Sequence, residues 1–197
     1  MRLRVTLAAV AASAAVLVAA GCGTQPDEPA PQGGAAAPAA SAASGSFNET
    51  DTMFLQMMVP HSTQGIAIVK LAADRSERED VKTLAKAIEV TQQDEIKRMS
   101  GWLEQWKQPA TASDKEHEEH GGMPGTSEKE ISALRKAKGA EFDRLFLDTL
   151  IAHQDDAVQL ARMETNAGVN VQATSYAKQV DQSRTAQIAQ MLEFRKQ

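Results

Sequence analysis

Two methionines and a histidine on one predicted helix form the first candidate metal site. Met57 and Met58 precede His61 by four and three residues, a spacing that places both thioethers on the same side of a helix as the imidazole. Thioether sulfur and imidazole nitrogen suit Cu(I), and imidazole also accepts Cu(II). Adjacent helical residues do not both face a core, so the two methionines are expected to flank the histidine at the helix surface. Pro60 lies immediately before His61, inside this predicted helix.

The other three histidines of the chain supply further candidate ligands. His153 lies in the second half of the chain, without methionines directly before it. His117, His120 and Met123 fall within seven residues, together with two glutamates. Short His-rich tracts of this kind are compositional candidates for metal binding. The chain has a single cysteine, which argues against a structural zinc site of the thiolate type, so copper is the metal best matched to these residues.

The chain repeats itself at a fixed offset of 92 residues, without a gap. The identical pairs are Asp51 and Asp143, Phe54 and Phe146, Leu55 and Leu147, His61 and His153, Ala85 and Ala177, Lys86 and Lys178, Ile96 and Ile188, and Met99 and Met191. The folded part is therefore expected to be one unit used twice. Any site that His61 and His153 build is expected to be pseudo-symmetric.

Apolar residues after position 47 recur at helical spacing, and no segment shows the sustained alternation of a strand. Four long helices are expected: one over residues 47–74, one from a capping box at Ser76–Glu79 to Pro109, one over 140–168 and one from 170 to the C-terminus. Each copy of the repeat is then a helical hairpin. Two hairpins bury their apolar faces most simply as a four-helix bundle, so the sequence predicts an all-α fold.

A polar segment over residues 110–126 separates the two predicted hairpins. Ser127–Glu130 follows it with the sequence of a second capping box, which predicts a short helix ending at Gly139. The domain over residues 47–197 is thus divided into a first repeat over about 47–108, a connector over 109–139 and a second repeat over about 140–197.

The N-terminus has the pattern of a secretory signal. Two arginines precede an apolar run over residues 5–20, which ends just before Cys22. Residues 17–22 resemble a bacterial lipobox, so residues 1–21 are expected to be a lipoprotein signal peptide. In this interpretation Cys22 carries a lipid that anchors the protein to the outer side of the cell membrane. The alternative is an ordinary signal peptide followed by a chance cysteine.

The segment after Cys22 is expected to be a disordered tether. Residues 23–46 consist almost entirely of Ala, Gly, Pro, Ser and Gln, a composition that cannot bury enough apolar surface to fold. The formal charge is −5, and it moves to −7 without residues 1–21, because these carry two arginines and no acidic residue. Such an acidic protein is a poor candidate for binding nucleic acid.

Several blocks of sequence resemble the DUF305 family of secreted or lipid-anchored bacterial proteins. The blocks are residues 51–61 (DTMFLQMMVPH), residues 122–125 (GMPG), residues 142–146 (FDRLF) and residues 151–153 (IAH). They occur in the right order, and the resemblance covers residues 48–197. It implies a ferritin-like four-helix fold. It also implies a role in copper binding or copper tolerance outside the cytoplasm, as for several members of the family.

The chain departs from the family pattern at several candidate ligand positions. The family usually has a His-His pair in each hairpin, whereas Ser62 and Gln154 follow the two histidines here. Thr126 stands where a methionine commonly follows the GMPG block, and Ile68 and Leu160 stand where the family often has methionine. Half of the paired imidazoles are therefore missing.

Three functions are weighed on these grounds. The first is a lipid-anchored protein that buffers copper or exchanges it with a donor or acceptor protein. The second is a metal-free member of the family that serves as an interaction or stress-response module of the cell envelope. The third, a di-iron oxidase, is disfavoured because no glutamate lies three residues before any histidine. No nucleophile triad, phosphate-binding glycine loop or catalytic carboxylate pair is visible, so no enzymatic activity is expected.

Overall fold

Five helices make up the fold of the computed structural model, which describes residues 45–112 and 125–197. They are α1 (Glu49–Arg75), α2 (Glu79–Gln105), α4 (Glu128–Lys136), α5 (Gly139–Ala167) and α6 (Val171–Phe194). No strand occurs among the described residues, so the all-α prediction is confirmed. The predicted long helices agree with α1, α2, α5 and α6 to within a few residues at most ends.

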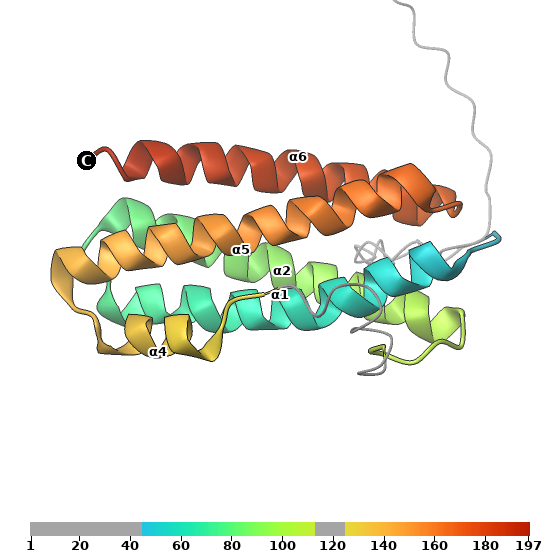
Figure 1. Ribbon diagram of the computed structural model, residues 1–197, viewed down its shortest axis with the longest axis horizontal. Helices are drawn as coiled ribbons and strands as arrows, with labels where there is room; N and C mark the ends of the chain where they lie inside the picture. Colours follow the sequence, from blue (N-terminus) through green and yellow to red (C-terminus); the bar gives the residue numbers. More distant parts are fainter. Residues whose placement is uncertain (1–44, 113–124) are drawn as a thin grey trace, which may run out of the picture. The chain divides into compact units, whose positions relative to one another are not determined.

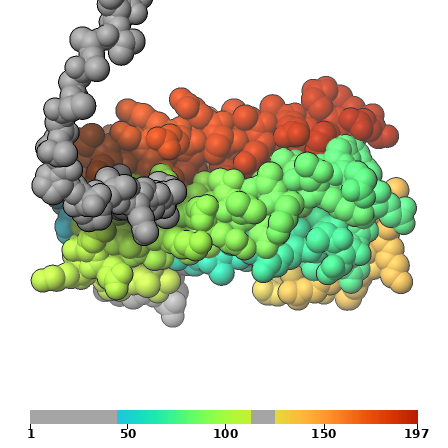
Figure 2. Space-filling model, turned by 180° about the vertical axis from the view of Figure 1, so that it is seen from behind, coloured from blue at the N-terminus to red at the C-terminus, as the bar shows by residue number. Residues whose placement is uncertain are grey.

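The four long helices form a bundle of two hairpins, as predicted. Figure 1 shows α1 and α2 as one antiparallel hairpin and α5 and α6 as the other, with α1 packed against α5. Figure 2 shows the bundle from behind the view of Figure 1, and on this face α6 lies alongside α2. The short helix α4 contacts both α1 and α5. Each hairpin is one copy of the sequence repeat.

The core consists of two apolar clusters with polar side chains between them. The first cluster is built around Phe54, Leu55, Met58, Met99, Trp102, Leu103, Tyr176 and Val180. The second is built around Ile68, Val81, Leu84, Ile88, Leu134, Phe142, Phe146, Leu147, Leu150 and Met191. On every long helix, the positions between these clusters carry buried polar residues. We call this set the polar layer: His61, Ser62, Gln92, Glu95, His153, Gln154 and Arg184.

Two capping boxes fix helix starts in the structure. At the start of α1, the Asn48 side chain accepts a hydrogen bond from the Asp51 N–H, and the Asp51 carboxylate accepts one from the Asn48 N–H. At the start of α4, Ser127 and Glu130 form the same reciprocal pair, which confirms the box predicted there.

The predicted capping box at Ser76 is wrong. Ser76 ends α1, and its hydroxyl accepts a hydrogen bond from the Arg78 N–H at 3.1 Å. Helix α2 begins at Glu79, so the glutamate is too early in the helix to reach back as the third residue of a box. Arg78 fixes this turn instead, because its guanidinium donates to Asp80 at 2.6 Å and to the Phe194 carbonyl at 2.8 Å.

The short helix of the connector ends earlier than predicted. Helix α4 stops at Lys136, whereas the sequence suggested an end at Gly139. Gly139 is instead the first residue of α5, and its φ of 54° lies in the left-handed region that glycine adopts without strain. The glycine therefore serves to start the next helix at a sharp change of direction.

The N-terminal predictions lie outside the part of the chain that the structure describes. They include the signal peptide, the lipidation site Cys22 and all but the last two residues of the tether. No helix within residues 45–112 and 125–197 is both long and apolar enough to cross a membrane.

Candidate metal centre

The structure brings the two predicted histidines into direct contact at the centre of the bundle. The imidazoles of His61 on α1 and His153 on α5 stack with their centroids 3.9 Å apart and their planes 10° from parallel. Both side chains are buried, with exposed fractions of 2% and 1%. The pair joins the two hairpins at equivalent positions, so the expected pseudo-symmetry is present.

Three of the four ring nitrogens have no hydrogen-bond partner among the described residues. They are both nitrogens of His61 and Nε2 of His153. The fourth, His153 Nδ1, lies 3.2 Å from the hydroxyl of Thr126. The Thr126 N–H donates to the side chain of Gln64 at 2.8 Å, so α1 positions the residue that orients the second imidazole. Buried polar atoms without partners point to a ligand or water that satisfies them.

Both imidazoles are neutral around pH 7. Burial holds the pKa of His61 well below its usual range, and the repulsion that a protonated His61 would meet from a protonated His153 and from Arg184 acts in the same direction. Burial also lowers the pKa of His153 to about 4, with the Arg184 charge acting in the same direction. A neutral imidazole is the form that binds a metal ion, so no proton needs to be displaced from either ring at pH 7.

A glycine on α1 allows an amide side chain to approach the histidine pair. A Cβ placed on Gly65 would lie 2.7 Å from Gln92 Oε1 and 2.9 Å from His153 Nε2, so both groups come close to the bare backbone. The Gln92 side chain is buried, and neither of its polar atoms has a partner among the described residues. Its oxygen is therefore a third potential ligand beside His153. Sequence reasoning missed it because a glutamine at a helical position resembles a solvated residue.

A buried ion pair lies in the same layer. The Arg184 guanidinium on α6 is fully buried and donates to Glu95 Oε2 on α2 through a short hydrogen bond. The other two guanidinium nitrogens, Nε and Nη1, have no partner in the described part of the chain. Burial raises the pKa of Glu95, an effect larger than the opposing one of Arg184. The repeat offset contained a signal for these residues, because it aligns Gln92 with Arg184 and Glu95 with Gln187.

Ser62 and Gln154 follow the two histidines, where the resemblance noted in the sequence implies a second histidine in each hairpin, and both belong to the layer. Ser62 is fully buried, and its hydroxyl has no partner among the described residues. The Gln154 side chain donates a short hydrogen bond to Gln187 Oε1 on α6. Both replacements are thus polar groups directly after the stacked rings, on the helices that carry them.

The two methionines before His61 are buried in the core, which corrects the expectation that they lie at the surface. Met57 is 4% exposed and Met58 is fully buried, and both belong to the first apolar cluster. Helix α1 packs against both α2 and α5, so its buried face is wide enough to include adjacent residues. Their thioethers lie about one turn before His61 and face the interior.

The remaining predicted ligands lie outside the described residues. These are His117, His120 and Met123 of the connector. Within residues 45–112 and 125–197, no three His, Cys, Asp or Glu side chains form a group that could hold a metal ion. The donors that the described residues bring together are two imidazoles and an amide, with thioethers one turn away. This nitrogen and sulfur set is better matched to copper than to hard cations, which prefer several carboxylates.

The stacked arrangement of the rings sets a condition for metal binding. Imidazole lone pairs lie in the plane of the ring, so two nearly parallel rings direct them side by side instead of towards a common point. An ion shared by His61 and His153 therefore requires at least one ring to rotate from its stacked position. The donor types fit copper, whereas the stacked orientation does not direct both lone pairs at one ion.

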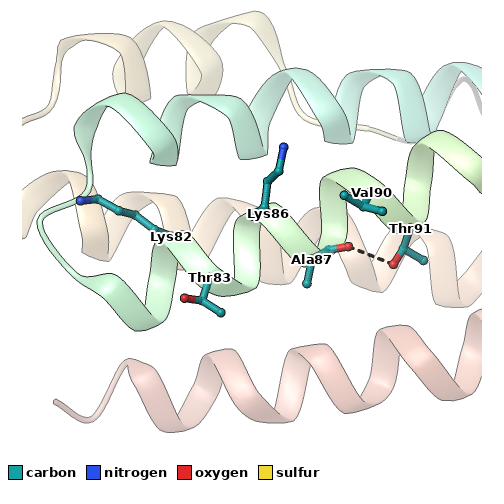
Figure 3. Close-up of a pocket in the computed structure, with 6 residues that line it drawn as sticks. All are labelled: Lys82, Thr83, Lys86, Ala87, Val90 and Thr91. Atoms are coloured by element: carbon teal, nitrogen blue, oxygen red, sulfur yellow. Dashed lines mark hydrogen bonds between the residues drawn. The ribbon is translucent and has the colours of Figure 1, made fainter.

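An open surface depression along α2 is unrelated to this centre. It has a volume of about 690 Å³ and is lined by Lys82, Thr83, Lys86, Ala87, Val90 and Thr91. Figure 3 shows these side chains along one helix, with the Thr91 hydroxyl donating to the Ala87 carbonyl at 2.9 Å. No predicted site residue lines it, and it offers no set of metal donors.

Comparisons with solved structures find the same fold in bacterial proteins. A DUF305 protein of Streptomyces coelicolor is 25% identical, with a TM-score of 0.69, and the match covers 74% of this chain and 91% of that one. The protein CopM in its Cu(I)-bound form is 29% identical, with a TM-score of 0.61, over 75% of this chain and 96% of CopM. Its Cu(II)-bound form is 30% identical, with a TM-score of 0.61, over 74% and 95%.

The family assignment follows from the match along the sequence. A search of curated proteins found no significant match. The family described as "Domain of unknown function (DUF305)" matches residues 51–195, which span all four long helices of the bundle. The chain therefore belongs to the DUF305 family.

Proposed function

We propose that this protein binds copper outside the cytoplasm and buffers it or passes it to a partner protein, with His61 and His153 as its central ligands. The observation that carries the proposal is a buried pair of imidazoles whose ring nitrogens mostly have no partner among the described residues. Two imidazoles from different hairpins are buried and neutral at pH 7, and three of their four nitrogens have no partner among the described residues. A purely structural histidine pair would be expected to satisfy more of these atoms within the core.

The relatives support copper as the metal. CopM, which shares the fold and 29–30% identity, has been solved in Cu(I)-bound and Cu(II)-bound forms. It has also been solved with Ag bound, an ion with the same charge and similar ligand preference as Cu(I). Met57 and Met58 supply thioethers close to the pair, and the connector residues His117, His120 and Met123 are further candidate donors.

The place of action that we propose is the outer side of the cell membrane. The support is the N-terminal pattern, in which an apolar signal run ends at Cys22 and a polar, proline-containing stretch follows. Lipid on Cys22 would hold the bundle near the membrane, where copper entering or leaving the cell passes. The protein would act as a binding protein and not as an enzyme.

A metal-free role is the competing proposal, and two specific observations favour it. The rings are stacked in parallel instead of directed at a common point, and Ser62 and Gln154 replace the second histidine of each pair. In that case the polar layer would serve only to fix the register of the two hairpins. The protein would then be an envelope interaction module.

Competition with a copper chelator decides between the two proposals. The full-length purified protein is expected to retain one copper ion against a weak chelator. The variant His61→Gln/His153→Gln is expected to lose this retention, while the matched control Thr63→Gln/Asp155→Gln, at exposed positions of the same two helices, keeps it. Thermal melts monitored by circular dichroism verify that both variants are folded. Full retention by a folded His61→Gln/His153→Gln variant would overturn the assignment, and no retention by the unmodified protein would favour the metal-free role.

A further inference from the structure

Arg184 occupies a place in the polar layer that the sequence repeat defines. The offset of 92 residues aligns Gln92 with Arg184, His153 with His61, and Gly65 with Ala157. Gln92 lies beside His153 at the backbone of Gly65. By the pseudo-symmetry of the two hairpins, we expect Arg184 on the His61 side of the layer, as the counterpart of Gln92. One half of the centre has a neutral amide, whereas the other half has a guanidinium.

The guanidinium places a positive charge close to the proposed ligands. Arg184 is fully buried, so water does not screen its charge, and Glu95 neutralises it from one side only. Arg184 binds Glu95, which lies about one turn after Gln92 on α2, and Gln92 lies beside His153, so the guanidinium belongs to the same buried layer as the rings. Any cation bound between these rings therefore experiences repulsion from Arg184.

This repulsion depends on the charge of the bound ion. The Coulomb energy between a fixed charge and an ion is proportional to the charge of the ion, so it is twice as large for a divalent ion as for a monovalent one at the same place. Softness of the donors favours Cu(I) over hard cations but distinguishes Cu(I) from Cu(II) less clearly, because both accept imidazole. The guanidinium therefore discriminates between monovalent and divalent ions by their charge, which the donor atoms alone do not do.

We propose that Arg184 is a specificity-determining residue that makes the His61–His153 centre select monovalent cations, Cu(I) or Ag(I), over divalent ones. The inference rests on the proposed function, since it concerns the same pair of ligands. Arg184 does not contact the ion in this account. It acts through its charge, and Glu95 limits that charge without removing it.

A charge series at two positions tests the proposal. Arg184→Gln/Glu95→Gln removes both charges and gives the two halves of the layer the same residues, because Gln92 and Gln187 are the equivalents. Replacing a buried ion pair with neutral groups is often tolerated. Glu95→Gln alone retains the arginine without its counter-charge, and Arg184→Lys retains a positive charge. Affinities for Ag(I), Zn(II) and Cu(II) are measured for all four proteins by competition titration, after circular dichroism confirms that they are folded.

The expected result is a fixed relation between the change in affinity for Ag(I) and the change in affinity for the divalent ions. The single variant Glu95→Gln and the double variant differ at position 184 alone, where the double variant has an uncharged glutamine in place of the charged arginine. If this charge weakens Ag(I) binding by a given factor, it should weaken Zn(II) and Cu(II) binding by about the square of that factor. Arg184→Lys should keep most of the preference for Ag(I) that the unmodified protein has.

Two other results would contradict the charge selection by Arg184 or the proposed copper binding, respectively. If the unmodified protein binds Ag(I) and copper but all ions change by equal factors along the series, the charge selection is wrong and the proposed function stands. If the unmodified protein binds none of the three ions, the proposed function itself is wrong, and the inference is lost with it.

Discussion

Gly65 is the residue whose lack of a side chain makes the contact between Gln92 and His153 possible. We predict that Gly65→Ala weakens copper retention at least tenfold and lowers the free energy of unfolding by about 1–3 kcal/mol, the usual cost of overpacking a core. The physical reason is the added Cβ, which would lie 2.7 Å from Gln92 Oε1 and 2.9 Å from His153 Nε2. Chelator competition and chemical denaturation measure the two effects.

Gly101 provides the matched control for this substitution. It also lies within a helix, but a Cβ placed there would meet nothing within 4 Å. Gly101→Ala should therefore raise the free energy of unfolding by about 0.5–1 kcal/mol and leave copper retention unchanged, because alanine favours the helix. Equal effects of the two substitutions on retention would show that the approach at Gly65 is irrelevant to the centre.

Glu164 makes the stability of the bundle depend on pH. Burial, and then the neighbouring Asp51 carboxylate, raise the pKa of Glu164 to about 8. The unfolded chain has the ordinary, lower pKa, so the folded state binds more protons between these two values and loses stability as the pH rises towards 8. We predict that Glu164→Gln removes this slope and stabilises the protein at pH 8 by about 1–4 kcal/mol. Urea denaturation at several pH values measures it.

Comparing the pH dependence of stability of Glu164→Gln with that of the unmodified protein separates the effect of the Glu164 carboxyl group from that of the histidines. The lowered pKa values of His61 and His153 act in the opposite sense, because the unfolded chain binds more protons below their ordinary pKa. Their contribution is common to both proteins and cancels in the difference. Glu141→Gln, at an exposed position of the same helix, is the control. A parallel pair of pH curves for Glu164→Gln and the unmodified protein would contradict the prediction.

At the scale of the elements, Asp51 ties the start of α1 to the turn between α5 and α6. Its carboxylate accepts hydrogen bonds from the N–H of Asn48 at 2.7 Å, and from the N–H groups of Val169 at 3.2 Å and Asn170 at 2.9 Å. As an acid in the first turn of α1, Asp51 also interacts favourably with the helix dipole. The structure adds a connection between the two hairpins at their end.

We predict that Asp51→Ala destabilises the protein by about 2–4 kcal/mol, because it removes a cap and leaves buried N–H groups without an acceptor. The exposed first-turn acid Glu49 is the control, and Glu49→Ala should cost less than about 0.5 kcal/mol. Thermal denaturation compares the two. Equal costs would mean that the hydrogen bonds to the α5–α6 turn contribute nothing beyond the helix dipole.

The same elements show how far the sequence predicts the structure. Helical periodicity places the long helices well, because it depends on many apolar residues at once. The start of α2 is harder, since Ser76 and Glu79 match a capping motif that the short turn cannot accommodate. The histidine pair is predictable from the repeat. Gln92 and Arg184 align at the same offset, but the offset does not show that they are buried, because such residues at helical positions normally face water and only the packing of four helices makes their positions internal.

At the scale of the whole molecule, the centre lies where the two hairpins meet, so bound copper should act on both. One ion held by His61 and His153 links α1 to α5 and stabilises only the assembled bundle. At about 100 times the dissociation constant, it should add roughly 2.7 kcal/mol to the free energy of unfolding. We predict that Cu(I) slows amide hydrogen exchange in both hairpins by a similar factor, of about 100-fold where exchange requires global unfolding. Mass spectrometry of peptides from each helix measures it.

The pattern of protection distinguishes a shared ion from separate sites. A single ion between the rings requires both histidines, so His153→Gln alone should abolish the added protection in α1 and α2 as well as in α5 and α6. If copper instead protects only the hairpin that retains its histidine, each imidazole binds on its own and the rings do not share an ion. Binding would then be a property of the hairpin and not of the bundle, and the stacking of His61 on His153 would have no part in it.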